Sequence, residues 1–335
     1  MPWADTKQKT STLGRVTNTD GSQYTGTGQM ATPPRTNTNK DAVHGWIEPK
    51  ATTNDGIPCQ IQGLEALLEG GWPQGSIIGL TGVGKTGKTS FALQEAILQA
   101  RAKRSVTYLY NESPQARFMA IAHKHRTALD IPTNQLETMR FFNMHGSTLK
   151  DPKPASIEKY AGWLVNTLRD DIQANNTEFV VLDSLTKFCR LWPAQAYYYV
   201  QQFTQGLWKA MAAMDKHPVV LAIAQKSGGH WEEQDATMLG GHGVGHELDG
   251  TIVFVRRAVD TWVHRELGLP LGGSLRTIRI DSLRDRDTDD SSHLLVQHNG
   301  RLSIGSTEED IRTRYEATQD KKPKAKGGGK QWGGQ

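Results

Sequence analysis

The sequence predicts an α/β fold in which a mostly parallel, twisted sheet carries helices on both faces and ends in an antiparallel edge. Through the middle of the chain, short apolar runs with the look of buried strands alternate with helix-like stretches, as they do when helices connect parallel strands. After Gly250 the apolar runs are separated by turns instead, which indicates antiparallel neighbours. Ligands of such sheets bind at the carboxyl ends of the parallel strands.

The parallel part of the sheet is predicted from the apolar runs Ser76–Thr81, Ser105–Tyr110, Thr138–Phe142, Phe179–Asp183 and Val219–Gln225. The spacing of apolar residues predicts helices from Thr89 to about Arg101 and from Ser156 to Asn175. The antiparallel edge is predicted from shorter strands at Thr251–Arg256, Arg276–Leu283, His293–Gln297 and Arg301–Ile304. An Asn299-Gly300 turn separates the last two of these strands.

Composition divides the chain into three parts. Residues 1–55 are rich in Thr, Asn, Gly, Gln and Lys without apolar periodicity, so we expect a disordered polar segment. Residues 56–317 form the predicted folded domain, and residues 318–335 a flexible basic Gly/Lys tail. The tail contains five Lys and one Asp, whereas the first 55 residues contain six Lys and Arg and five acidic residues. The formal charge of +4 therefore resides mainly in the tail.

The two cysteines and the apolar runs limit the class of protein. Cys59 and Cys189 are far apart and form no C-x-x-C pair, so neither a disulfide framework nor a zinc site is predicted. The N-terminus lacks an apolar leader, and the longest apolar run, Val219–Ala224, is too short to span a bilayer. We therefore expect a soluble, cytoplasmic protein without a membrane partner and without zinc.

The strongest motif lies at residues 82–89, which read G-V-G-K-T-G-K-T between a predicted strand and a predicted helix. This G-x-x-x-x-G-K-[ST] pattern is a phosphate-binding loop, in which backbone N–H groups point at phosphate oxygens. Lys88 is expected to reach the β- and γ-phosphates and Thr89 to bind Mg²⁺, so the predicted cofactors are ATP and Mg²⁺. The predicted nucleotide-binding residues are Gly82, Val83, Gly84, Lys85, Thr86, Gly87, Lys88, Thr89 and Ser90.

Acidic residues follow two of the predicted strands. Asp183 ends an apolar strand and is a candidate second Mg²⁺ ligand, although an Asp at a strand end also serves as a simple turn or cap residue. Glu112 follows Tyr110 and is the candidate general base that orients water toward the γ-phosphate. A helix N-cap region at Glu112, Ser113 and Pro114 is the alternative, and both roles are compatible.

Polar, basic and aromatic residues that follow the predicted strands or lie in the tail are candidates for contacts with the γ-phosphate or with DNA. Gln225 is a candidate sensor of the γ-phosphate that reports to the following Gly-rich loop. Basic and aromatic residues in two loops and the tail suit single-stranded DNA, through phosphate contacts and base stacking. These residues are Lys187, Arg190, Lys226, His230, Trp231, Lys322, Lys324, Lys326, Lys330 and Trp332. A protein or subunit contact at the loop and a merely solubilising tail remain alternatives.

Three stretches resemble the RecA/RadA/KaiC superfamily of P-loop ATPases. Gly63 to Ser76, G-L-E-A-L-L-E-G-G-W-P-Q-G-S, is similar to the leader of the first core strand, and Tyr108 to Ser113 resembles the segment that carries the catalytic glutamate. Leu239 to Phe254 is similar to a stretch of bacterial RadA (Sms). The resemblance covers about residues 57–305 and is closest to the RadA ATPase core. It implies a RecA-like core that forms a hexameric ring or a filament with ATP between subunits.

The resemblance also implies a basic residue that reaches the neighbouring subunit's phosphates. Arg284 and Arg286 fall where RadA has a Lys-Asn-Arg-Phe-Gly motif, and they are the candidates for this role. The motif itself is absent from this chain. Because Asp285 and Asp287 alternate with the two arginines, a run of surface ion pairs is the alternative. The zinc finger and Lon-like domain of RadA cannot fit in this chain.

On the resemblance, we expect an ATP-dependent motor that binds single-stranded DNA in recombination, repair or replication. A hexameric replicative-type helicase and a KaiC-like regulatory ATPase that acts through protein partners are the alternatives. A compact ATPase of this type also suits a phage or mobile element, in which case the location is the host cytoplasm.

Overall fold

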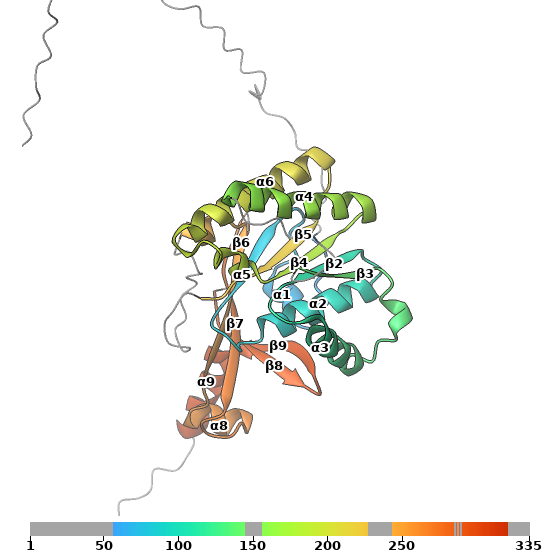
Figure 1. Ribbon diagram of the computed structural model, residues 1–335. Helices are drawn as coiled ribbons and strands as arrows, with labels where there is room; N and C mark the ends of the chain where they lie inside the picture. Colours follow the sequence, from blue (N-terminus) through green and yellow to red (C-terminus); the bar gives the residue numbers. More distant parts are fainter. Residues whose placement is uncertain are drawn as a thin grey trace, which may run out of the picture. The chain divides into compact units, whose positions relative to one another are not determined.

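The computed structural model describes residues 56–144, 156–226 and 243–320, except 285, 287 and 289. Within these residues nine strands form one sheet in the order β3-β2-β4-β5-β1-β6-β7-β8-β9 (Figure 1). The strands are β1 (Ile77–Thr81), β2 (Val106–Tyr110), β3 (Met139–Asn143), β4 (Phe179–Asp183), β5 (Val219–Ile223), β6 (Gly250–Ala258), β7 (Ser274–Leu283), β8 (His293–His298) and β9 (Arg301–Thr307). Strands β1 to β6 pair in parallel and β6 to β9 antiparallel, which confirms the predicted fold class.

Helices cover both faces of the parallel strands (Figure 1). On one face α2 (Lys88–Arg101) and α3 (Gln115–Ala128) pack in a core with residues such as Ile78 and Tyr108. On the other, α4 (Ile157–Asn175) and α6 (Ala196–Met214) pack with Ile77 and Val180. The short helices are α1 (Leu64–Leu67), α5 (Leu185–Cys189), α7 (Gly243–His246) and α8 (Thr261–Leu267). The longer helix α9 (Glu308–Asp320) follows β9, and 3-10 turns lie at Thr133–Gln135 and Pro193–Gln195.

The central parallel strands are buried over their whole length because helices cover both of their faces. Every residue of β1, β2, β4 and β5 is buried, and their sequences are correspondingly apolar without alternation. The residues of β3, which is the edge strand, are only partly buried. No helix among the described residues is long and apolar enough to cross a membrane.

The C-terminal part of the sheet differs from the prediction in two ways. Strand β6 pairs in parallel with β1 as well as antiparallel with β7, so the antiparallel edge begins one strand later than predicted. The expectation of shorter strands there was wrong, since β6 has nine residues and β7 ten against five in β1. The additional length carries a separate small core with α8 and α9, formed by Val259, Val263, Leu275, Leu294 and Ile311. Helix α9 also includes residues 318–320, which the sequence assigned to the tail.

The segment before β1 is attached to α2 by a fully buried carboxylate. Glu95 accepts hydrogen bonds from the indole Nε1 of Trp72 (2.9 Å), the backbone N–H of Ile61 (2.9 Å) and Nε2 of Gln99 (2.7 Å). The backbone N–H of Gln60 donates to the same carboxylate at 3.0 Å. Burial raises the pKa of Glu95, whereas these donors favour its ionised form. The leader is therefore fixed to the helix that follows the phosphate-binding loop.

Candidate ATP hydrolysis site

The phosphate-binding loop connects the end of β1 at Thr81 to the start of α2 at Lys88. Gly82 has φ = 138°, and a Cβ atom there would lie 2.2 Å from the carbonyl oxygen of Phe254 in β6, so only glycine fits. Gly87, with φ = 107°, is the N-cap of α2. The loop therefore places the free N–H groups of the first turn of α2 at its centre, where they suit an anion.

Lys88 is buried inside this loop. Its Nζ donates hydrogen bonds to the carbonyl oxygens of Gly82 and Val83, both at 2.7 Å, and to Oγ1 of Thr86 at 3.2 Å. Burial lowers the pKa of Lys88 to about 8, while the nearby carboxylates of Glu112 and Asp183 act in the opposite direction. The ammonium group thus lies inside the loop, and its contact with the β- and γ-phosphates stays a prediction.

Asp183 lies beside Thr89, as the predicted metal site requires. Oγ1 of Thr89 donates to Oδ1 of Asp183 at 3.3 Å, and the hydroxyl of Tyr108 donates to Oδ2 at 2.9 Å. Burial raises the pKa of Asp183 to about 6. Mg²⁺ prefers one or two protein oxygens together with phosphate and water oxygens, so this hydroxyl and carboxylate fit it. Within the described ranges, no group of three or more His, Cys, Asp or Glu residues could hold a metal ion.

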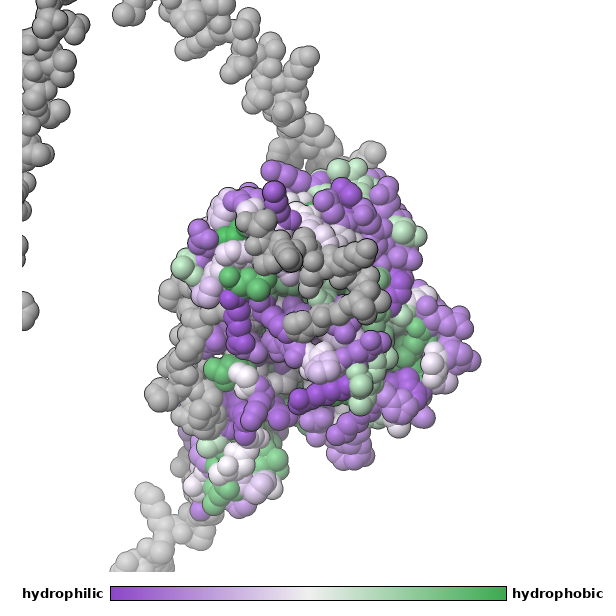
Figure 2. Space-filling view, in the orientation of Figure 1, coloured by the Kyte–Doolittle hydropathy of each residue, from purple (hydrophilic) through white to green (hydrophobic). Residues whose placement is uncertain are grey.

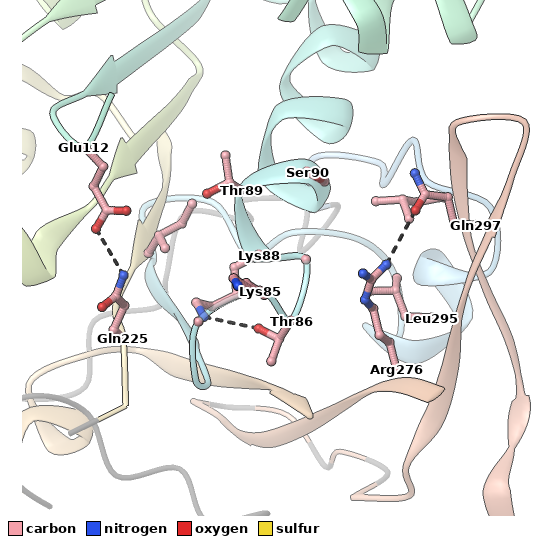
Figure 3. Close-up of a pocket in the computed structure, with 14 residues that line it drawn as sticks. Lys85, Thr86, Lys88, Thr89, Ser90, Glu112, Gln225, Arg276, Leu295 and Gln297 are labelled. Carbon is pink, nitrogen blue, oxygen red and sulfur yellow. Dashed lines mark hydrogen bonds between the residues drawn. The ribbon is translucent and has the colours of Figure 1, made fainter. Parts of the chain in front are cut away.

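Glu112 faces the same pocket from the end of β2 (Figure 3). Its Oε1 accepts hydrogen bonds from Oγ of Ser184 at 2.5 Å and from Nε2 of Gln225 at 3.3 Å. The N-cap of α3 is Pro114, and no side chain caps that helix. Glu112 therefore lines the pocket and does not cap the helix.

Gln225 connects Glu112 to the residues that follow β4. Its Oε1 accepts a hydrogen bond from Nη2 of Arg190 at 2.9 Å, and its backbone N–H donates to Oγ1 of Thr186 at 2.5 Å. Nζ of Lys187 donates to the carbonyl oxygen of Asn111, next to Glu112. The sequence placed Lys187 and Arg190 in a loop, but Lys187 lies within α5 and Arg190 is the C-cap of this helix.

The pocket has a volume of about 320 Å³ and two distinct ends (Figure 3). Glu112 and Gln225 lie at one end, the phosphate-binding loop in the middle, and Arg276 with Gln297 at the other. Its remaining lining residues include Ile223, Leu295 and Leu302. Sequence reasoning missed Tyr108, Ser184 and the residues of β7 to β9. The available signals were the adjacency of Ser184 to Asp183 and the position of Arg276 between the apolar residues Leu275 and Ile278 in β7.

Arg284 and Arg286 lie outside the residues that line this pocket. Nη1 of Arg284 forms an ion pair with Oδ1 of Asp249 at 2.8 Å, and its guanidinium carbon lies 5.6 Å from the ring centroid of Trp208. Nη1 of Arg286 donates to the carbonyl oxygens of Leu68 and Gly71. Both side chains thus have partners within their own subunit, and whether they act on a neighbouring subunit stays a prediction.

The other predicted DNA contacts fall mainly beyond the described residues. Lys226 is described, and its backbone N–H donates to the carbonyl oxygen of Gly82 at 3.1 Å. The residues outside the described ranges are His230, Trp231, Lys322, Lys324, Lys326, Lys330 and Trp332.

Comparisons with known proteins agree with this geometry. No curated protein sequence matches the chain. Among solved structures, the KaiC-like protein PH0186 from the hyperthermophilic archaeon Pyrococcus horikoshii OT3 is similar with a TM-score of 0.54 at 14% sequence identity, over 75% of this chain and 98% of that one. This similarity shows the shared fold. The family model described as "ATPase: KaiC" matches residues 57–309. The chain therefore belongs to the KaiC family of ATPases, within the RecA/KaiC superfamily of P-loop ATPases.

Proposed function

We propose that this ATPase hydrolyses ATP at subunit interfaces while bound to single-stranded DNA, as a motor in DNA recombination, repair or replication. The observation that carries the proposal is the chain of contacts from Arg190 through Gln225 to Glu112. A phosphate that binds Arg190 competes with Oε1 of Gln225 for the guanidinium. Because Nε2 of the same amide donates to Glu112, occupancy at Arg190 changes the position of the candidate base.

Each group of pocket residues has a separate role in the proposed hydrolysis reaction. Backbone N–H groups of the loop and the ammonium of Lys88 bind the triphosphate, and Thr89 and Asp183 hold Mg²⁺, which neutralises charge on the phosphates. Glu112 orients and polarises the attacking water. Ser184 and Gln225 hold the Glu112 carboxylate through their hydrogen bonds and so position it.

The chain that follows Arg190 carries exposed groups suited to unpaired nucleotides. Exposed side chains of Leu191 (47%), Tyr197 (39%) and Tyr198 (36%) follow Lys187 and Arg190 in the chain. Aromatic rings beside cations bind single strands through stacking and phosphate contacts. In Figure 2 the hydrophobic areas of the viewed face are small and separate.

The test is ATPase activity with and without a single-stranded oligonucleotide, at low and moderate salt. We expect DNA to raise the rate, with a salt-sensitive response. Arg190→Ala should reduce the ratio of stimulated to basal rate toward one. The matched control is Arg169→Ala, which removes an exposed arginine of α4 that pairs only locally with Asp170. If single-stranded DNA leaves the wild-type ATPase rate unchanged at every salt concentration, the proposal is contradicted.

A KaiC-like regulatory ATPase that responds to protein partners is the second candidate, and the family match favours it. Removal of residues 321–335, a segment with five Lys, separates the two candidates. A DNA motor should lose affinity for single strands after this deletion, whereas a regulatory ATPase should not respond to DNA with or without the segment. Directional unwinding of a forked duplex would identify the helicase form of the motor.

A further inference from the structure

We propose that the wall of the pocket formed by Arg276, Leu295, Gln297 and Leu302 binds the nucleoside half of ATP, with the Arg276 guanidinium on the α-phosphate. The wall is built from the antiparallel strands β7, β8 and β9, in the same subunit as the phosphate-binding loop. This inference rests on the ATPase activity of the family and does not depend on DNA binding.

The two ends of the pocket fix the direction in which the nucleotide lies. Glu112 and Gln225 are at one end, which is the γ-phosphate end because the candidate base acts there (Figure 3). The loop binds the phosphates between the two ends. The nucleoside must then lie at the opposite end, where Arg276 and Gln297 project into the pocket.

The wall is held directly against the phosphate-binding loop. A Cβ atom placed on Gly87 would lie 3.5 Å from Cδ2 of Leu295 and 4.0 Å from Cδ of Arg276. The side-chain amide of Gln94 in α2 bonds both backbone groups of Leu302, each at 2.8 Å. Strand β9 is therefore attached to the helix that begins with Lys88, and the distance between loop and wall is fixed.

Arg276 carries a charge that no acidic side chain among the described residues balances. Its Nε is buried without a hydrogen-bond partner, and its Nη1 makes only a long contact of 3.5 Å with Oε1 of Gln297. Arg256 of β6 lies directly opposite it in the register of the sheet. No ion pair within the described part of the chain involves either arginine. Like charges directly opposite each other destabilise a sheet, and a bound phosphate would offset that cost.

The rest of the wall offers the chemistry of a base site. Leu295 and Leu302 are 6% and 5% exposed and supply apolar surface beside the loop. Gln297 lies two residues beyond Leu295, on the same face of β8, and its side chain is exposed at the pocket. The amide of Gln297 presents one donor and one acceptor, which match N7 and the N6 amino group of adenine, whereas the same edge of guanine presents two acceptors, N7 and O6. The site should therefore prefer ATP over GTP.

The test compares ATP with inorganic tripolyphosphate, which has three phosphates and no nucleoside, in equilibrium binding titrations. Arg276→Gln should weaken both ligands by about 10- to 100-fold, because a charged hydrogen bond is lost. Gln297→Ala should weaken ATP by about 2- to 10-fold, reduce the preference for ATP over GTP, and leave tripolyphosphate unchanged. The control Arg279→Gln removes an arginine on the other face of β7, paired with Asp281 at 3.0 Å, and should change neither ligand.

Unchanged ATP affinity in both Arg276→Gln and Gln297→Ala would overturn the proposal. Gln297 is exposed, so its variant remains informative if Arg276→Gln does not fold. Failure of the wild-type chain to bind either ligand would contradict nucleotide binding itself. Absence of a response to single-stranded DNA would contradict only the proposed motor function.

Discussion

Asp183 and Glu112 differ in their surroundings, and this difference supports the different roles that we propose for them. Asp183 is buried, accepts hydrogen bonds from Tyr108 and Thr89, and is held beside the loop threonine. Glu112 accepts from Ser184 and Gln225 and lies at the open end of the pocket. A buried carboxylate beside the loop threonine suits a metal ligand, whereas one at the γ-phosphate end of the pocket suits activation of water.

Glu112→Gln should leave ATP binding intact and slow hydrolysis by about 10²- to 10⁴-fold, because the amide has no basic oxygen. Single-turnover hydrolysis and equilibrium ATP binding, measured on the same preparation, check this expectation. Lys88→Ala is the comparison, since it should abolish binding. A Glu112→Gln protein with a normal rate would exclude Glu112 as the base.

Asp183→Asn should raise the Mg²⁺ concentration needed for half-maximal ATPase activity, because a neutral amide oxygen replaces a charged ligand. A Mg²⁺ titration at saturating ATP measures the shift, and chelation of the metal should stop hydrolysis in the wild type. The exposed Asp170 of α4 provides the control variant Asp170→Asn. An identical Mg²⁺ requirement in Asp183→Asn and wild type would remove Asp183 from the metal site.

The sequence was sufficient to predict which residues meet at the loop, because parallel strands deliver their carboxyl ends to one edge of the sheet. Glu112, Asp183 and Gln225 follow from this rule, and Lys88 follows from the loop motif. The contacts of Tyr108 and Arg276 could not be predicted in this way, because they depend on the register of the strands and on the length and direction of the side chains. Tyr110, and not Tyr108, is the register partner of Asp183, so the Tyr108 hydroxyl reaches it diagonally.

At the scale of elements, the sequence predicted the parallel strands and the long helices α2 and α4, but it gave no bounds for α3 and α6 and did not identify the short helices. Helices α5 and α8 have five and seven residues, too few for a periodic apolar pattern. The Asn299-Gly300 turn is present, with φ = 50° and 81° at its two residues. The lengths of β6 and β7 were underestimated because their outer ends pack on α8 and α9, which the sequence did not reveal.

Glu95→Gln should destabilise the fold by about 1–3 kcal/mol. All partners of this carboxylate are donors, so the new amide NH₂ group would face N–H groups without an acceptor. Urea unfolding measures the change in the free energy of unfolding. The control is Glu65→Gln, whose carboxylate accepts the backbone N–H of Cys59 at an exposed position and should cost much less. Equal stability of both variants would contradict a structural role for the buried carboxylate.

For the whole molecule, the position of Arg284 determines which site it can serve. Asp249, its ion-pair partner, donates its backbone N–H to Ile77 at the start of β1, whereas the phosphate-binding loop follows Thr81 at the other end. These two ends are separated by roughly 13 Å along the strand. Arg284 therefore lies at the edge of the sheet opposite to its own ATP site, so the predicted contact with phosphates can be made only at a neighbouring subunit's site.

A subunit-mixing experiment tests this assignment. Arg284→Ala subunits keep their own loop and base, so they should be inactive alone only because the neighbour supplies no arginine. Lys88→Ala subunits cannot hydrolyse ATP themselves but carry an intact Arg284. A mixture of the two inactive proteins should regain activity, which rises with the proportion of Lys88→Ala subunits up to an optimum. The double variant Lys88→Ala/Arg284→Ala, added in the same amounts, should restore nothing. If the mixture stays as inactive as its components while both proteins remain folded and associated, Arg284 does not act between subunits.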